Sequence, residues 1–156
     1  MLDEVVGVPM SVGTSRQLEQ ATTAAGAAPG EEARPYVPQQ AVAHLDETRW
    51  RQGGKQAWLW GAVTTWVTVF VVRLSRGGQV ARELLGETCA GSLVPDRYSA
   101  YNWYPVRWRQ LCWAHLLRDC EAMRARGGTS AEVEAALLAQ AHQMFTGWHR
   151  VRDAGP

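Results

Sequence analysis

Residues 44–50 read HLDETRW and directly follow the small and apolar stretch 41–43. A short apolar run of this kind predicts a buried strand over about residues 40–46. Asp46 then lies where the strand leaves the core, which is a common place for an acid that holds a metal ion or a proton. One acid makes no site, so any partners of Asp46 must come from other parts of the chain.

The surrounding pattern predicts further strands that would share a sheet with the first one. Strand-like runs follow at about 56–63, 66–74, 92–95 and 108–112, and a helix is expected over 79–87. Three consecutive strands fit an antiparallel meander, and the later alternation of strand and helix fits parallel additions to the same sheet. This is an α/β layout with a mixed sheet, as in a ribonuclease H-like fold. In that layout the first and fourth strands are neighbours, so Asp46 and Asp96 are expected to meet at one end of the sheet.

Three segments are expected along the chain. They are an N-terminal helical segment with a linker, the first part of a ribonuclease H-like core, and the start of a C-terminal helical region, over residues 1–39, 40–128 and 129–156. Ser11 or Thr14 is expected to cap the first helix. The Gly- and Pro-containing stretch 26–38 is typical of a linker. Residues 129–132 (TSAE) have the pattern of a capping box for the last helix.

Length and composition exclude several classes of protein. A chain of 156 residues has room for one domain with a sizeable core, and its 46% apolar content is too high for a disordered chain. The cysteines, at 89, 112 and 120, are odd in number and form no CxxC pair, which indicates reduced thiols. Asp3 and Glu4 replace the basic start of a signal peptide, so a cytoplasmic protein is expected.

An uncharged stretch at 56–72 (QAWLWGAVTTWVTVFVV) raises the alternative of a membrane span. It is shorter than the ~20 residues that a spanning helix needs. It is also rich in Val, Thr, Trp and Phe, which favour strands. Two adjacent buried strands with a turn near Thr64 and Thr65 explain it better, and no membrane association is expected.

The charges are unevenly distributed, although the net charge is only +1. Residues 1–40 carry −3, residues 41–128 carry +5 and residues 129–156 carry −1. Every base in the middle segment except Lys55 is an arginine, whose planar group suits phosphate. The distribution favours an anionic partner, and arginines that only solvate a small surface are the alternative.

Two aspartates at adjacent strand ends in a basic region suit a hard divalent cation. Mg²⁺ prefers oxygen ligands and is commonly held by one or two carboxylates. Two such metals can bind the attacking and leaving oxygens of a phosphodiester exchange, and a third acid normally completes a site of that kind. By residue type alone, Asp96 could equally cap a short helical turn at 97–101.

Several long motifs, in order, resemble the insertion sequence 66 (IS66) family of DDE transposases over nearly the whole chain. The matching stretches are VPMSVGT, HLDETRWRQGGKQAWLW, the SR of RLSRGG, LLG, GSLVPDRYSAYN and RQLCWAHLLRD. The resemblance implies a ribonuclease H-like core that cuts and rejoins DNA with Mg²⁺, or with Mn²⁺ in its place. Asp46 matches the first catalytic and metal-binding acid of the family and Asp96 the second. The DNA partners would be the transposon ends and the target, and full-length members are expected to form homo-oligomers.

The third acid of the family is a glutamate in a downstream motif that does not occur before Pro156. The family's upstream zinc-binding and DNA-binding segments are also missing, so the chain resembles a transposase truncated at both ends. Inactivity of the fragment is therefore expected, and the alternative function is a non-catalytic, DNA-binding remnant of a mobile element.

Five side chains are candidates for contact with DNA. They are Arg97, Arg107, Arg109, His115 and Arg118. Arg97 could instead pair with the neighbouring Asp96, and His115 and Arg118 are expected to point from their helix toward the acids. Cys112 and His115 have metal-ligand spacing, but one CxxH without a second pair is a poor zinc site, so Cys112 is expected to pack in the sheet.

The expectations extend to two further groups of residues. Glu47 and Thr48 are interpreted either as solvent-facing turn residues or as direct metal ligands. Three tryptophans are expected in the core, namely Trp58, Trp60 and Trp66.

Overall fold

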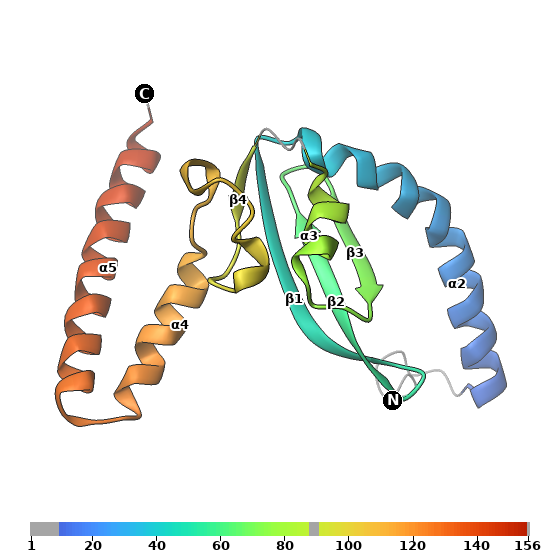
Figure 1. The fold of residues 1–156 in the computed structure, drawn as a ribbon, viewed down its shortest axis with the longest axis horizontal. Helices are drawn as coiled ribbons and strands as arrows, with labels where there is room; N and C mark the ends of the chain where they lie inside the picture. The colour runs from blue at the N-terminus through green and yellow to red at the C-terminus, as the bar shows by residue number, and fades with distance from the viewer. Residues whose placement is uncertain (1–9, 88–90, 156) are drawn as a thin grey trace.

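A four-stranded mixed sheet forms the centre of the chain in the computed structural model, which describes residues 10–87 and 91–155 (Figure 1). The strands are β1 (Val42–Gln52), β2 (Lys55–Val63), β3 (Thr68–Arg73) and β4 (Ser92–Val94). Their order in the sheet is β3-β2-β1-β4. β1 and β3 both run antiparallel to β2, while β4 runs parallel to β1. The predicted α/β class and mixed sheet are confirmed, and the first and fourth strands are neighbours as the ribonuclease H-like layout requires.

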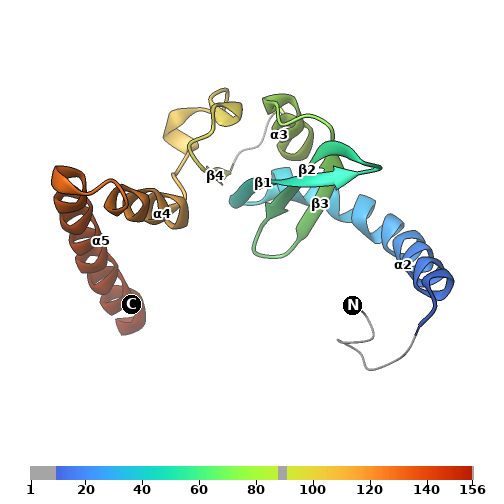
Figure 2. The ribbon, with the colours of Figure 1, turned by 90° about the horizontal axis from the view of Figure 1, so that it is seen from below.

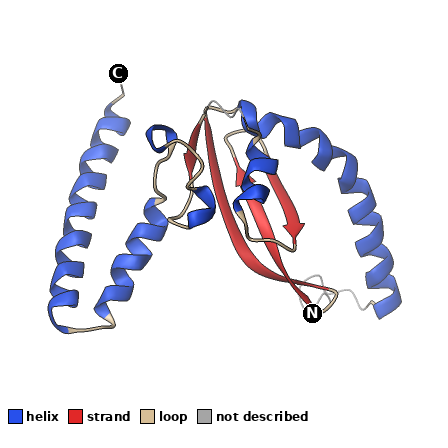
Figure 3. Ribbon diagram, in the orientation of Figure 1, coloured by secondary structure: helices blue, strands red, loops and turns tan. Residues whose placement is uncertain are grey.

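Helices surround this sheet on its sides and on one face (Figure 3). They are α2 (Val12–Ala33), α3 (Gly78–Leu85), α4 (Trp113–Arg124) and α5 (Gly128–Ala154), with short 3₁₀ turns η1 (Arg34–Gln39), η2 (Ser99–Tyr101) and η3 (Val106–Trp108). Seen from below, α3 lies on one face of the sheet, with α2 and the α4–α5 pair extending on opposite sides (Figure 2). None of the described helices is both long and apolar enough to cross a membrane.

The core lies between α3 and the covered face of the sheet. Alternate residues of β1, starting with Ala43 and Leu45, point to this face, as the two-residue period of a strand requires. Trp60 of β2 is fully buried there, and its Nε1 donates a hydrogen bond to the Ser75 carbonyl at 3.1 Å. On the other side of the core, α3 contributes the buried residues Val80, Ala81, Leu84 and Leu85.

The opposite face of the sheet is open. Val63 and Phe70 on this face are 42% and 64% exposed. Phe70 lies over Gly61, where an added Cβ would come within 3.1 Å of its ring. The open face therefore presents apolar side chains directly beside the strand that carries Asp46.

Two expectations about the strands were wrong. β1 continues to Gln52 in a hairpin with β2, turning at Gly53 and Gly54 (φ 56° and 76°), so Asp46 lies within a strand. The predicted fifth strand, 108–112, is reduced to one parallel bridge between Leu93 and Arg109. Hydrogen bonds from Gln110 N to Leu93 O (2.8 Å) and from Cys112 N to Pro95 O (2.9 Å) keep residues 109–112 parallel to the end of β4. Pro95 has no N–H with which to return a bond, so the ladder stops there.

The helices also differ from expectation at their ends. Ser11 caps α2 as predicted, accepting a hydrogen bond from Thr14 N at 3.1 Å. The helix then runs through most of the predicted linker to Ala33, because the alanine- and glutamate-rich sequence has a high helix propensity that outweighs Pro29. α5 begins after Gly127 with no side-chain cap, so the predicted capping box is absent.

The helices α4 and α5 form an antiparallel pair at one side of the molecule (Figure 1). Trp113 and Phe145 meet edge to face, with ring centroids 5.3 Å apart. Glu134 of α5 is buried at the pair's turn and bonds to Arg124 at 3.1 Å.

Candidate metal centre

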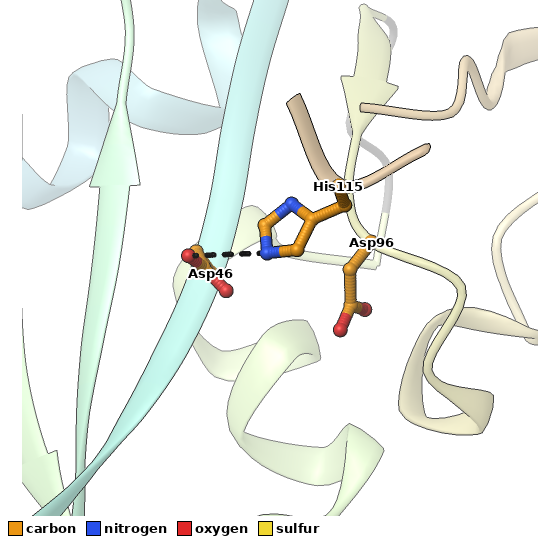
Figure 4. Close-up of side chains that lie close together, drawn as sticks. All are labelled: Asp46, Asp96 and His115. Carbon is orange, nitrogen blue, oxygen red and sulfur yellow. Dashed lines mark ion pairs between the residues drawn. The ribbon is translucent and has the colours of Figure 1, made fainter. Parts of the chain in front are cut away.

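Asp46, Asp96 and His115 converge at the junction of β1, β4 and α4 (Figure 4). Each offers one ligand atom, and these atoms all lie within 4.8 Å of one another. Among the described residues this is the one group of three or more acidic, histidine or cysteine side chains so arranged. The predicted approach of the two aspartates is therefore present in the fold.

Asp46 is presented by the pleat of β1. Its neighbours Leu45 and Glu47 point to the covered face, so its own side chain points the other way and is 64% exposed. Its Oδ1 accepts a hydrogen bond from Glu47 N at 3.0 Å. Gly61 lies opposite Asp46 on β2 with the Phe70 ring over it, and a hollow lined by Asp46, Gly61 and Phe70 opens on that side.

Asp96 follows β4 after the buried Pro95. Its Oδ1 accepts a hydrogen bond from Tyr98 N at 2.8 Å, which turns the chain toward η2. The turn-forming role is thus real, but it uses only one oxygen. The same side chain can therefore form the turn through Oδ1 and still offer a ligand atom to the cluster.

His115 enters the site from the first turn of α4. Its Nε2 lies 3.8 Å from Asp46 Oδ2, and its Nδ1 is buried with no hydrogen-bond partner in the described part of the chain. The bond from Cys112 N to Pro95 O fixes the start of α4 beside β4. Cys112 is itself the N-cap residue of α4 and lies in no strand, so the expectation that it packs in the sheet was wrong.

Sequence reasoning missed the role of Glu47. Its side chain is 0% exposed, so it is neither a solvent-facing turn residue nor a member of the metal cluster. Its carboxylate accepts hydrogen bonds from Tyr101 Oη and from Arg76 Nε, the latter at 2.8 Å. The alternation of Ala43 and Leu45 is the signal that could have placed Glu47 on the covered face.

Electrostatics around Glu47 follow from its burial. Desolvation raises the pKa of the Glu47 carboxyl, against the lowering effect of its bonds to Tyr101 and Arg76. Burial and the bond to Glu47 raise the pKa of the Tyr101 hydroxyl, which keeps it a donor. The negative charge of Asp96 also raises the pKa of both groups, because it lies near this buried network.

The predicted DNA-contacting arginines divide into two groups. Arg97 forms an ion pair with Asp119 of α4, and not with Asp96, which was the alternative to contact with DNA. Arg109 donates to Tyr101 O at 2.8 Å and to Asn102 Oδ1 at 3.1 Å, and so helps to hold η2. Arg107 and Arg118 are exposed, with no ion pair to any described residue.

The fold and this cluster define an α/β protein with a candidate divalent-metal centre at the junction of two parallel strands. Residues 1–153 match the sequence pattern described as the Transposase IS66 family. The chain therefore belongs to the IS66 family of transposases, as its motifs indicated, and membership implies DNA as a partner and a divalent metal. No significant match was found among curated proteins or among solved structures.

Proposed function

We propose that this chain carries the metal-holding part of a transposase that cleaves and joins DNA strands, with Asp46 and Asp96 as the catalytic acids. The observation that carries the proposal is the convergence of these two carboxylates with His115 within 4.8 Å. Membership of the IS66 family supports the reaction class. We also propose residues 40–128 as the catalytic core, flanked by the helical segments 1–39 and 129–156.

The donor set fits a divalent cation. Asp46 and Asp96 supply the oxygens that Mg²⁺ prefers, and His115 adds an imidazole nitrogen, which favours transition metals such as Mn²⁺ over Mg²⁺. A bound ion would polarise a phosphoryl oxygen and favour ionisation of the attacking hydroxyl. The protein's own contribution is to bring Asp46, Asp96 and His115 together from β1, the end of β4 and α4, and to leave Asp46 accessible to DNA.

The metal site is tested by binding of Mn²⁺ to the purified chain, followed by calorimetry or by electron paramagnetic resonance. Asp46→Asn removes a charged ligand, so its Mn²⁺ affinity should fall by more than the ~10–100-fold that loss of an outer-shell partner typically causes. Asp119→Asn is the matched control, because Asp119 is an exposed acid on α4 that pairs with Arg97 outside the cluster. Equal affinities for wild type and Asp46→Asn would contradict the proposal. His115→Gln should in addition narrow the preference for Mn²⁺ over Mg²⁺.

DNA contact is proposed for Arg97, Arg107, Arg109, His115 and Arg118, with Arg107 and Arg118 as the arginines free to neutralise phosphate. Binding should be independent of sequence and should weaken as salt rises, by about 0.9 log unit in affinity per log unit of salt for each phosphate contacted. Arg107→Gln with Arg118→Gln should therefore flatten the salt slope by about 2.

The matched control for this prediction is Arg51→Gln with Lys55→Gln. It removes the same charge from the β1–β2 hairpin end, where both residues are exposed. Fluorescence anisotropy on duplexes of two unrelated sequences, over a series of salt concentrations, gives the slopes. If both double variants flatten the slope equally, the effect is one of net charge and the proposed interface is wrong.

A second candidate function is a DNA-binding remnant without catalysis. It is favoured by the composition of the cluster, which holds only two carboxylates among the described residues. The two functions share the DNA interface and differ in cleavage.

A further inference from the structure

A fully buried carboxylate stands directly behind the candidate metal centre. We propose that Glu47, Arg76 and Tyr101 form an internal clamp that sets the separation of Asp46 and Asp96, which makes them positioning residues for the metal site. This inference rests on the proposed function, because the clamp matters through the ion that the two aspartates would share.

The backbone ladder alone does not fix the two acids. The parallel pairing of β1 with β4 runs from Val42 and Ser92 to His44 and Val94 and ends there. Asp46 and Asp96 each lie two residues beyond that last pair. Other contacts must therefore hold the strand and the turn together at the level of the acids.

Glu47 provides the contact from the side of β1. It follows Asp46, so the pleat sends the two side chains to opposite faces of the sheet. Its buried carboxylate accepts from Arg76 Nε at 2.8 Å and from the hydroxyl of Tyr101. Since neither Glu47 nor Tyr101 is accessible, their bond cannot be exchanged for water without opening the core.

Tyr101 and Arg76 carry this contact to the side of Asp96. Tyr101 N donates to Tyr98 O at 3.2 Å, and Tyr98 N donates to Asp96 Oδ1 at 2.8 Å, so Tyr101 belongs to the turn that Asp96 starts. The Arg76 guanidinium lies 3.9 Å from the centre of the Tyr98 ring and 4.7 Å from that of Trp58. The contacts thus join Asp46 to Asp96 through Glu47 by two routes, one through Tyr101 and one through Arg76 and Tyr98.

Two tyrosines in the same segment offer a matched pair of variants. Both are buried, and both donate a hydroxyl hydrogen bond, Tyr101 to Glu47 and Tyr104 to the Gly91 carbonyl. Tyr101→Phe and Tyr104→Phe therefore delete equivalent groups, but only the first touches the clamp. Tyr101→Phe should weaken Mn²⁺ binding by about 10–100-fold, the range seen for partners that orient metal ligands, while Tyr104→Phe should change it less than about twofold.

Unfolding by urea separates positioning from general stability. Tyr101→Phe should lose somewhat more stability than Tyr104→Phe, because it takes a donor from a buried carboxylate and not from a backbone carbonyl. Mn²⁺ affinity is therefore compared under conditions in which the unfolding curves show both variants to be folded, so that a difference reports the clamp. Equal effects of both variants on Mn²⁺ affinity would overturn the inference. Arg76→Gln, at a side chain 37% exposed, provides a second variant that should fold and should also bind Mn²⁺ more weakly.

If the wild-type chain binds no Mn²⁺, the proposed function is contradicted. The clamp can then still be tested by a measurement that needs no metal. Amide hydrogen exchange over 96–101 should be faster in Tyr101→Phe than in Tyr104→Phe, because the turn loses its tie to β1. The same protection in both variants would show that Glu47 does not hold this turn, whatever the metal result.

Discussion

Trp60→Ala is expected to cost about 3–5 kcal/mol of stability, measured at 25 °C. Trp60 is completely buried between β2 and α3, and its ring meets the edge of Tyr101 with centroids 6.3 Å apart. Truncation would leave a cavity and also remove the bond from its Nε1 to the Ser75 carbonyl. The total stability of a natural domain is about 5–15 kcal/mol, so this loss is a large fraction of it.

Trp66→Ala is the matched control, with the same change of side chain in the turn between β2 and β3. Trp66 is 81% exposed, so its replacement should change stability by less than about 0.5 kcal/mol. Urea unfolding followed by circular dichroism gives both values. Similar losses in the two variants would mean that Trp60 does not organise the core in solution.

The three tryptophans show what composition can and cannot predict. Trp58, Trp60 and Trp66 were all expected in the core because they lie in one apolar stretch. Trp60 is buried and Trp58 packs against the core, but Trp66 falls in the turn before β3, where no layer covers it. The strand pattern predicts that residues alternate between the two faces of the sheet. It does not show which face is covered, or which residues lie in a turn and not in a strand.

The approach of Asp46 to Asp96, in contrast, was predictable from the sequence. Strand periodicity and order placed the first and fourth strands together, which brings Asp46 near Asp96 whatever the details of each strand end. His115 was also expected to point from its helix toward the acids, and it does. Its distance from Asp46, however, depends on how α4 starts beside β4, through the hydrogen bonds from Gln110 and Cys112 to Leu93 and Pro95. Such contacts join segments distant in sequence, and no local pattern encodes them.

Purified residues 1–156 are expected neither to nick nor to join DNA, with Mg²⁺ or with Mn²⁺. Where catalytic groups act as a unit, losing one member costs nearly as much as losing all of them. The cluster holds two carboxylates and an imidazole, so a second ion would lack the acid that fixes it beside the first.

The other glutamates of the region offer no substitute. Glu47 points to the opposite face and is held by Arg76 and Tyr101. Glu134 is buried against Arg124, so it is not available. Glu121 and Glu132 are exposed on α4 and α5, outside the cluster.

The assay is cleavage of supercoiled plasmid and of element-end oligonucleotides, with Asp46→Ala run in parallel. The open face of the sheet, with Phe70 and Val63 exposed, makes aggregation a competing cause of inactivity, so each preparation must first be shown to be monodisperse and folded. Cleavage by the wild-type chain that disappears in Asp46→Ala would contradict the prediction. It would mean that His115, or an acid that moves when DNA binds, takes the place of the third carboxylate. Mn²⁺ binding without cleavage, in contrast, is the result expected of a folded metal site that lacks one acid.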